Sequence, residues 1–208
     1  MIRLPAADLA RVESLLARGG RRLLGLVGAP GSGKSTVAQA LLEAFPDRAQ
    51  VVPMDGFHLA GTELERLGRA DRKGAPDTFD SAGYVALLHR LRTQPAGEVV
   101  YAPEFRREIE EPVAGAIAVR PDTPLVITEG NYLLLDDGHW AGAAPLLDEV
   151  WYVEVDDTLR LERLLSRHQQ FGRSREAALA WVARTDEPNA RRIAATRGRA
   201  HHLLRLDA

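Results

Sequence analysis

The stretch Gly28-Ala29-Pro30-Gly31-Ser32-Gly33-Lys34-Ser35 decides how this chain folds, because it fits the pattern of a glycine, four residues and then Gly-Lys-Ser. Residues 22–27 before it have the composition of a short buried strand. Residues 36–45 after it carry apolar side chains at helical spacing. A strand, a glycine-rich turn and a helix bring backbone N–H groups and the positive end of a helix dipole to one point. The stretch therefore predicts a loop that binds the phosphates of a nucleoside triphosphate.

The lysine and the serine that close this run have the chemistry that a triphosphate needs. The ammonium group of Lys34 is expected to reach the outer phosphates, and the hydroxyl group of Ser35 to bind Mg²⁺. Lys34 is one of only 2 lysines among 27 basic residues, so a chance match to the pattern would be rare in such a chain. Contacts to the nucleotide are expected from these residues: Gly28, Ala29, Pro30, Gly31, Ser32, Gly33, Lys34, Ser35 and Thr36.

The composition is that of an ordinary globular protein. The 208 residues suit one domain, 1–208, and the net charge of −2 argues against a nucleic-acid binder, which usually has a basic domain. The chain has no cysteine and no apolar stretch near 18 residues, so we expect a cytoplasmic protein without membrane insertion. Residues 157–208 nevertheless hold 11 arginines against 6 acidic residues. That excess serves either the capture of a small polyphosphate or nothing beyond arginine-rich codon usage.

Predicted strands and helices alternate along the chain. Besides residues 22–27, strands are expected at 49–54, 125–128, 149–155 and 202–206. Besides residues 36–45, helices are expected at 6–18, 81–92, 157–169, 174–184 and 188–199. This alternation indicates an α/β fold with three α/β/α layers around a mostly parallel, doubly wound sheet.

Two acidic residues lie where predicted strands end. Ligands in such sheets bind beyond the carboxyl ends of the strands, so the loop at Gly28, Asp55 and Glu129 should converge on one cleft. Asp55 there either accepts the proton of an attacking hydroxyl group or helps to hold Mg²⁺, and Gly56 allows substrate to approach closely. Glu129 is expected to bind Mg²⁺ directly or through water, since a carboxylate leaving a buried strand is costly without a cation. The alternatives are an Asp-Gly turn at the first position and a solvated strand end at the second.

Residues 57–119 are expected to form a substrate-binding insertion, with a long loop and two short strands at 99–101 and 113–119. Within it Lys73 lies on a turn that contains Gly74 and Pro76, which suits substrate recognition, although a plain surface loop would look the same. His58 is placed near the substrate because it lies close to Asp55 in the sequence. Packing roles are expected for the three tryptophans: Trp140, Trp151 and Trp181.

Residues 160–175 are expected to form a helical lid. Arg163 and Arg167 are four residues apart and so share one face of a predicted helix. Arg173 follows Gly172, a residue that can end one helix, and precedes Ser174, which can cap the next. Such a helix–loop–helix can close over ATP and neutralise charge during phosphoryl transfer. The alternative is a solvated helix face.

Together these motifs resemble the bacterial pantothenate kinases and uridine kinases, a branch of the P-loop kinases. Four blocks match in order: GAPGSGKST at 28–36, PMDGFH at 53–58, RKGAPDTFD at 72–80 and VITEGNYLL at 126–134. The match continues through residues 160–174 and 186–197, so it covers nearly the whole chain. The stretches YAPEF, EEPVAGAI and DEPNA are most similar to a subgroup labelled as fructose-transport-system kinases. The resemblance implies a P-loop NTPase fold.

The resemblance also implies roles for individual residues. Asp55 would be the catalytic base, acting with Lys34 and Arg173, while Ser35, Glu129 and Asp55 would be the Mg²⁺ partners. Arg163, Arg167 and Arg173 would be lid contacts to ATP, with Asn189 beside the adenine. Substrate contacts would come from Asp55, His58, Lys73, Tyr101, Phe105 and Arg107. Members of the subgroup place an aspartate before an arginine where this chain has Phe105-Arg106-Arg107. That change either alters substrate choice or removes a salt bridge.

The leading functional hypothesis is an ATP-dependent phosphotransferase that acts on a hydroxyl group of a small metabolite. A sugar such as fructose, a nucleoside and a pantothenate-like compound all stay open as acceptors. The alternative is an ATP-binding regulator or transport-system partner with weak or no kinase activity. A GTPase is excluded because its Asn-Lys-x-Asp motif needs a lysine, and both lysines lie elsewhere. The sequence leaves the oligomeric state open, a homodimer included.

Overall fold

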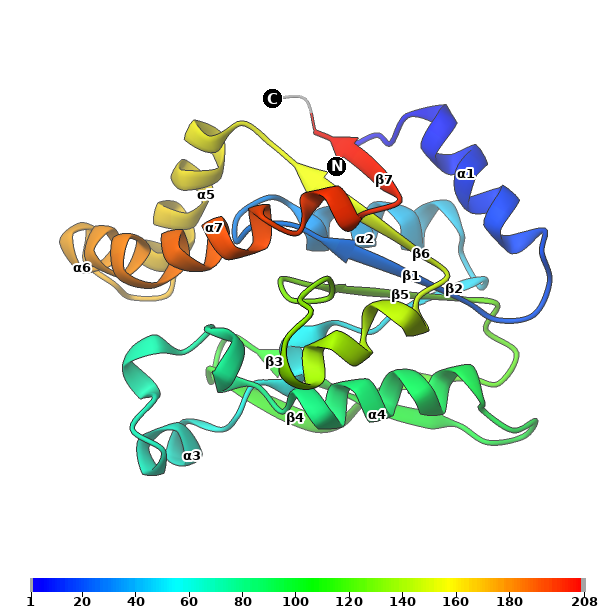
Figure 1. The fold of residues 1–208 in the computed structure, drawn as a ribbon, viewed down its shortest axis with the longest axis horizontal. Coiled ribbons are helices and arrows are strands. Elements are labelled where there is room, and N and C mark those ends of the chain that lie inside the picture. The colour runs from blue at the N-terminus through cyan, green and yellow to red at the C-terminus, as the bar shows by residue number, and fades with distance from the viewer. Residues whose placement is uncertain (1, 207–208) are drawn as a thin grey trace.

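A five-stranded parallel sheet forms the centre of the protein (Figure 1). The structure is a computed structural model that describes residues 2–206. The strands lie in the order β2 (Ala49–Val51), β5 (Leu125–Gly130), β1 (Arg22–Val27), β6 (Glu149–Glu154) and β7 (His202–Arg205). Every pairing in this sheet is parallel. The carboxyl ends of the strands therefore meet at one edge, where Val27 of β1 lies beside Gly130 of β5 and Tyr152 of β6.

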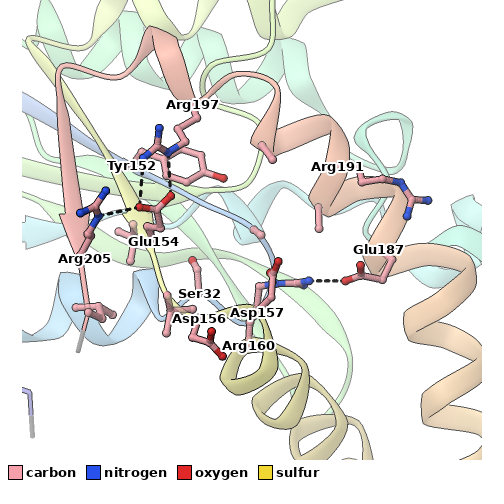
Figure 2. Close-up of a pocket in the computed structure, with 16 residues that line it drawn as sticks. Ser32, Tyr152, Glu154, Asp156, Asp157, Arg160, Glu187, Arg191, Arg197 and Arg205 are labelled. Carbon is pink, nitrogen blue, oxygen red and sulfur yellow. Dashed lines mark hydrogen bonds and ion pairs between the residues drawn. The ribbon is translucent and has the colours of Figure 1, made fainter. Parts of the chain in front are cut away.

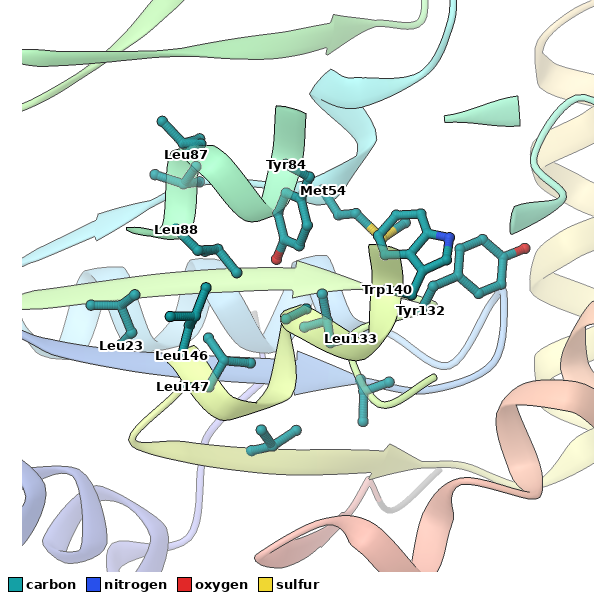
Figure 3. Packing of buried hydrophobic residues seen from close by; sticks show 14 of the residues in the cluster. Leu23, Met54, Tyr84, Leu87, Leu88, Tyr132, Leu133, Trp140, Leu146 and Leu147 are labelled. Carbon is teal, nitrogen blue, oxygen red and sulfur yellow. The ribbon is translucent and has the colours of Figure 1, made fainter. Parts of the chain in front are cut away.

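Helices cover both faces of this sheet. On one face α1 (Ala6–Leu16) and α2 (Lys34–Ala44) pack against apolar residues of β1, β5, β6 and β7. On the other face lie α4 (Ser81–Arg92), α7 (Glu187–Ala194) and two short 3₁₀ turns at Gly138–Gly142 and Ala144–Leu146. Figure 3 shows the packing on this second face, with Tyr84 and Trp140 among leucines from β1, α4 and the turns. The three-layer α/β/α fold predicted from the sequence is confirmed.

A separate antiparallel hairpin, formed by β3 (Val100–Arg106) and β4 (Glu111–Val119), lies beside α4 (Figure 1). It packs against the 3₁₀ turn Met54–Phe57, which follows β2, while α3 (Gly61–Arg66) lies in the loop before α4. A side chain at Gly56 would collide with the carbonyl oxygen of Pro103 in β3. Gly56 was expected to allow close approach of the substrate, but the backbone of the hairpin occupies the space next to it instead.

Residues 160–175, which were expected to form a lid, lie within two helices and a π-helical turn that extend from the carboxyl edge of the sheet at the left of Figure 1, and we call these three elements the lid region. They are α5 (Asp157–Gln170), α6 (Arg175–Trp181) and the turn Val182–Asp186, which leads into α7. Asp156 caps α5 and Ser174 caps α6, each by accepting hydrogen bonds from backbone N–H groups. Gly172 takes the left-handed conformation between the two helices, with φ of 91°.

Some element boundaries differ from the predicted ones for local reasons. Strand β2 ends at Val51 rather than at residue 54, because Pro53 has no N–H group for the sheet. Asp55 therefore lies in a 3₁₀ turn beyond the strand end, whereas Glu129 lies inside β5. Helix α2 begins at Lys34, two residues earlier than predicted. No helix among the described residues is both long and apolar enough to cross a membrane.

Candidate active site

The glycine-rich loop between β1 and α2 holds the side chain of Lys34 in a buried position. The Lys34 ammonium group donates hydrogen bonds to the carbonyl oxygens of Gly28, at 2.9 Å, and Ala29, at 3.2 Å. Burial lowers the pKa of Lys34 to about 8, although the nearby carboxylates of Glu129 and Asp55 act to raise it. The loop thus carries a desolvated cation next to its own backbone N–H groups, which is an arrangement suited to an anion.

Ser35 and Glu129 form a direct pair at the start of α2 and the end of β5. The Ser35 hydroxyl donates a hydrogen bond of 2.9 Å to Glu129 Oε1. Burial raises the pKa of Glu129, and the negative charge of Asp55 raises it further, against the opposing effect of Lys34. A hydroxyl group and two carboxylates are oxygen ligands of the kind that Mg²⁺ prefers, so these side chains fit the ion that the sequence predicted.

Asp55 enters the same cleft from the 3₁₀ turn after β2. Its carboxylate forms an ion pair with Arg107, with 3.3 Å between Asp55 Oδ2 and Arg107 Nη2. The backbone oxygen of Asp55 contacts His58 Nδ1 at 2.8 Å. The imidazole of His58 lies between two aromatic rings, with centroid distances of 4.0 Å to Phe79 and 4.7 Å to Phe105. Burial lowers the pKa of His58, so its ring is a neutral part of the wall.

Two arginines of the lid region face the cleft without a carboxylate partner among residues 2–206. Burial lowers the pKa of Arg167, and the positive charge of Arg107 lowers it further. The guanidinium carbon of Arg173 lies 3.8 Å from the centroid of the Trp181 ring, and its Nη1 atom is buried without a hydrogen-bond partner. Burying unpaired cations is costly, so this arrangement favours a ligand that carries negative charge.

One cavity of about 250 Å³ brings most of the predicted site residues together. They come from the loop, the turn after β2, the 72–80 loop, the hairpin, β5 and the lid region. The predicted residues that line it are Pro30, Gly31, Lys34, Ser35, Asp55, His58, Lys73, Phe105, Arg107, Glu129, Arg167, Arg173 and Asn189. The expected convergence of the loop, Asp55 and Glu129 on one cleft is therefore confirmed as geometry.

Several predicted residues lie outside this cleft. Tyr101 is 58% exposed and does not line it, because its side chain points to solvent from β3. Arg163 is also exposed, but its Nη1 atom lies 3.6 Å from where a Cβ of Gly33 would be, next to the loop. Arg106, where the sequence departs from the resembling subgroup, forms an exposed ion pair with Glu104 at 3.6 Å. Arg106, the residue that differs from the subgroup, therefore does not line the cleft.

A second cavity of about 530 Å³ adjoins the loop from the side of β6 and β7 (Figure 2). Ala29 and Ser32 of the loop line this cavity rather than the cleft. Its charged side chains largely pair with one another. Glu154 binds Arg197 and Arg205, while Arg160 binds Asp157 and Glu187 (Figure 2). The Arg160–Glu187 pair ties the first turns of α5 and α7 together, so it fixes the base of the lid region.

Several other residues line the cleft although they were not predicted as site residues. Trp181 was expected to be a packing residue, yet it lines the cleft and its ring contacts the Arg173 guanidinium. Asn131 lines the cleft just after β5, and a polar residue after a predicted Glu-Gly strand end was the available signal. His168 and Asp186 pair at 2.7 Å beside Arg173, a contact that only the fold brings together.

A sequence profile of the phosphoribulokinase/uridine kinase family matches residues 23–204. The chain belongs to this family. A "putative uridine kinase" of Schizosaccharomyces pombe is 36% identical over 190 residues, which cover 86% of this chain and 80% of that one. The "uncharacterized protein YggC" of Escherichia coli is 36% identical over 191 residues, covering 89% of this chain and 78% of that one. The protein is thus a P-loop kinase, as its motifs predicted.

Solved structures agree with this assignment. A crystal structure described as a "putative fructose transport system kinase" from Silicibacter sp. TM1040 matches with a TM-score of 0.84 and 39% identity, covering 98% of this chain and 99% of that one. A crystal structure of YFH7 from Saccharomyces cerevisiae, described as "a putative P-loop containing kinase", matches with a TM-score of 0.78 over 99% of this chain and 100% of that one. Its identity is 20%, so this second likeness bears on the fold alone. As a kinase of this family, the protein binds a nucleotide and has a small-molecule substrate.

Proposed function

We propose that this kinase transfers the γ-phosphoryl group of ATP to a hydroxyl group of a small metabolite, with Asp55 as the general base. The supporting observation is that Asp55, Lys34 and Glu129 lie in one cleft. The charges of these residues shift the pKa values of Lys34 and Glu129. The acceptor oxygen forms a bond to the γ-phosphorus while the bond from that phosphorus to the β–γ bridging oxygen breaks. The hydroxyl proton passes to the Asp55 carboxylate.

The nucleotide would be held by the loop and the lid region. The backbone N–H groups of the loop and Lys34 would bind the phosphates, and Arg167 and Arg173 would neutralise charge at the outer phosphate. Arg163 lies beside Gly33 and takes part in no ion pair of the described residues, so its guanidinium plane is free to stack on the base. Asn189 lines the same cleft as Lys34. Its place beside the adenine stays a prediction.

Ser35 and Glu129 would hold Mg²⁺, with Asp55 near enough to contribute. Such an ion supplies positive charge that offsets the charge developing on the phosphates. We place the reaction in the cytoplasm, where ATP is available. A sugar such as fructose, a nucleoside and a pantothenate-like compound are the proposed acceptor classes. Asp55 and the Ser35–Glu129 pair are the groups that catalysis requires, and their presence favours a kinase over a regulator with vestigial activity.

The substitution Asp55→Asn tests the proposed base. It keeps the shape of the side chain and removes its ability to take a proton. The variant should bind ATP about as tightly as the wild type and turn over at least about 100-fold more slowly. Asp122→Asn is the matched control, since Asp122 pairs with Arg120 on the exposed surface. Near-normal turnover by Asp55→Asn would remove Asp55 from the mechanism. Tight ATP binding without ADP release for any sugar, nucleoside or vitamin would instead favour the regulator.

A further inference from the structure

Two cations that line the cleft lie close to the same aromatic ring, that of Phe105. Lys73 comes from the loop before α4, and Arg107 follows the last residue of β3. The Lys73 nitrogen lies 5.3 Å from the centroid of the Phe105 ring, and the Arg107 guanidinium carbon lies 5.8 Å from it. Phe105 in turn packs on His58, which packs on Phe79. These tilted rings and both cations therefore line the same pocket.

The acidic residues of the cleft form a single ion pair with these two cations, between Asp55 and Arg107, among residues 2–206. Glu129 is bound to Ser35, and Asp186 is bound to His168. Lys73 donates to the backbone oxygen of Glu110 and forms no ion pair among residues 2–206. Arg107 has one carboxylate partner, Asp55, which phosphoryl transfer itself requires.

We infer that the acceptor carries an anionic group, a carboxylate or a phosphate monoester, which binds Arg107 and Lys73. This inference rests on the phosphotransfer proposed above and names the substrate class for that site. A neutral sugar or nucleoside would leave Lys73 without an ion pair and Arg107 bound to the Asp55 carboxylate, whereas an anion pairs with both cations. The rings of Phe79, Phe105 and the buried His58 form a neutral part of the wall beside these cations, and the acidic residue Glu110 lines the same cavity.

The same contact explains how the acceptor prepares the base. Without a ligand, the guanidinium of Arg107 lies on the Asp55 carboxylate. An acceptor anion competes for Arg107, and the Asp55 carboxylate then becomes available to the hydroxyl proton. Arg107 is thus a residue that determines specificity and positions the base, and water, which has no anionic group, does not release Asp55 in this way.

Three matched pairs of compounds test the inference: pantothenate and pantothenol, glycerate and glycerol, and fructose 6-phosphate and fructose. Uridine is added as a neutral nucleoside. Turnover is measured as ADP release, and binding as the melting shift that each compound produces with a non-hydrolysable ATP analogue present. We expect an anionic member to exceed its neutral partner by at least about 100-fold in kcat/KM. Turnover of a carboxylate compound or of the phosphate compound identifies which anionic group the cleft binds.

Three variants connect this preference to the cleft: Arg107→Gln, Lys73→Gln and the control Arg106→Gln. The first two should raise the KM for the anionic acceptor at least about 10-fold, abolish its melting shift and leave the KM for ATP within about threefold. Arg106→Gln removes the same charge from the exposed neighbour and should change none of these values.

Preference for a neutral acceptor, or equal behaviour of Arg107→Gln and Arg106→Gln, would overturn the inference while leaving the kinase proposal intact. The inference is also overturned if no anionic compound gives a melting shift that depends on Arg107. Failure of the wild type to bind the ATP analogue, measured by calorimetry, would instead contradict the proposed function.

Discussion

Replacing Lys34 with methionine tests whether burying this cation destabilises the ligand-free protein. The pKa of Lys34 is lowered from 10.5 to about 8. Each pKa unit corresponds to about 1.36 kcal/mol, so the charged form costs on the order of 3 kcal/mol of folding free energy. Methionine fills similar space but loses the hydrogen bonds to Gly28 and Ala29, each worth about 1 kcal/mol. The Lys34→Met protein should therefore be more stable at pH 7 by about 1 kcal/mol.

The difference in stability between the wild type and the Lys34→Met protein should depend on pH. Because the folded pKa is below the unfolded one, the unfolded chain binds more protons between pH 8 and pH 10.5, and the stability of the wild type rises through that window. The cost is complete below pH 8. The advantage of the variant should thus be present at pH 7 and gone by pH 10.

Urea unfolding of both proteins at pH 7 and pH 10 measures the difference in the free energy of unfolding directly. Lys73→Met is the matched control, because the other lysine is only half-buried and should change stability by less than about 0.5 kcal/mol. The Lys34→Met protein should also lose the stabilisation by ATP that the wild type shows. A variant less stable than the wild type at pH 7, or a difference unchanged at pH 10, would refute the reasoning.

Two further substitutions probe the loop and its partner strand. Glu129→Gln keeps a hydrogen-bond acceptor for Ser35 but removes the charge, so the Mg²⁺-dependent part of nucleotide affinity should fall at least about 10-fold. Calorimetry with and without Mg²⁺ checks this, and an equal loss in both conditions speaks against a metal role. Gly28→Ala places a Cβ 2.5 Å from the carbonyl oxygen of Val153 and 2.7 Å from Ser32 Oγ, so it should cost about 1–3 kcal/mol of stability. An unchanged urea midpoint would contradict the clash.

The sequence was sufficient for features that depend on neighbouring residues. The loop before α2 needs left-handed backbone at Gly31 and Gly33, with φ of 83° and 93°, which glycine adopts without strain. The strand before it and the helix after it follow from local apolar spacing, so residues 22–27 were predicted with correct bounds. Parallel strands also share one edge, which is why the meeting of the loop with Asp55 and Glu129 could be expected from strand ends alone.

Residues of the hairpin and the lid region were harder to place, because their directions depend on distant packing. Tyr101 and Phe105 belong to one strand, but the register of β3 against β4 shifts between Ala102 and Glu104, so a regular alternation does not predict which of them faces the cleft. Likewise the Trp181 ring contacts the Arg173 guanidinium only because the chain turns back after Gly172.

Local sequence thus determined that this chain makes a phosphate-binding loop and a parallel α/β/α sheet, since glycine conformation and apolar spacing are properties of short segments. Tertiary structure decided which cations share the cleft. Arg107 faces Asp55 while its neighbour Arg106 faces solvent. The reason is physical: the direction of a side chain on a strand is set by the register with its partner strand and by what packs behind it, and both are contacts between residues far apart in the chain.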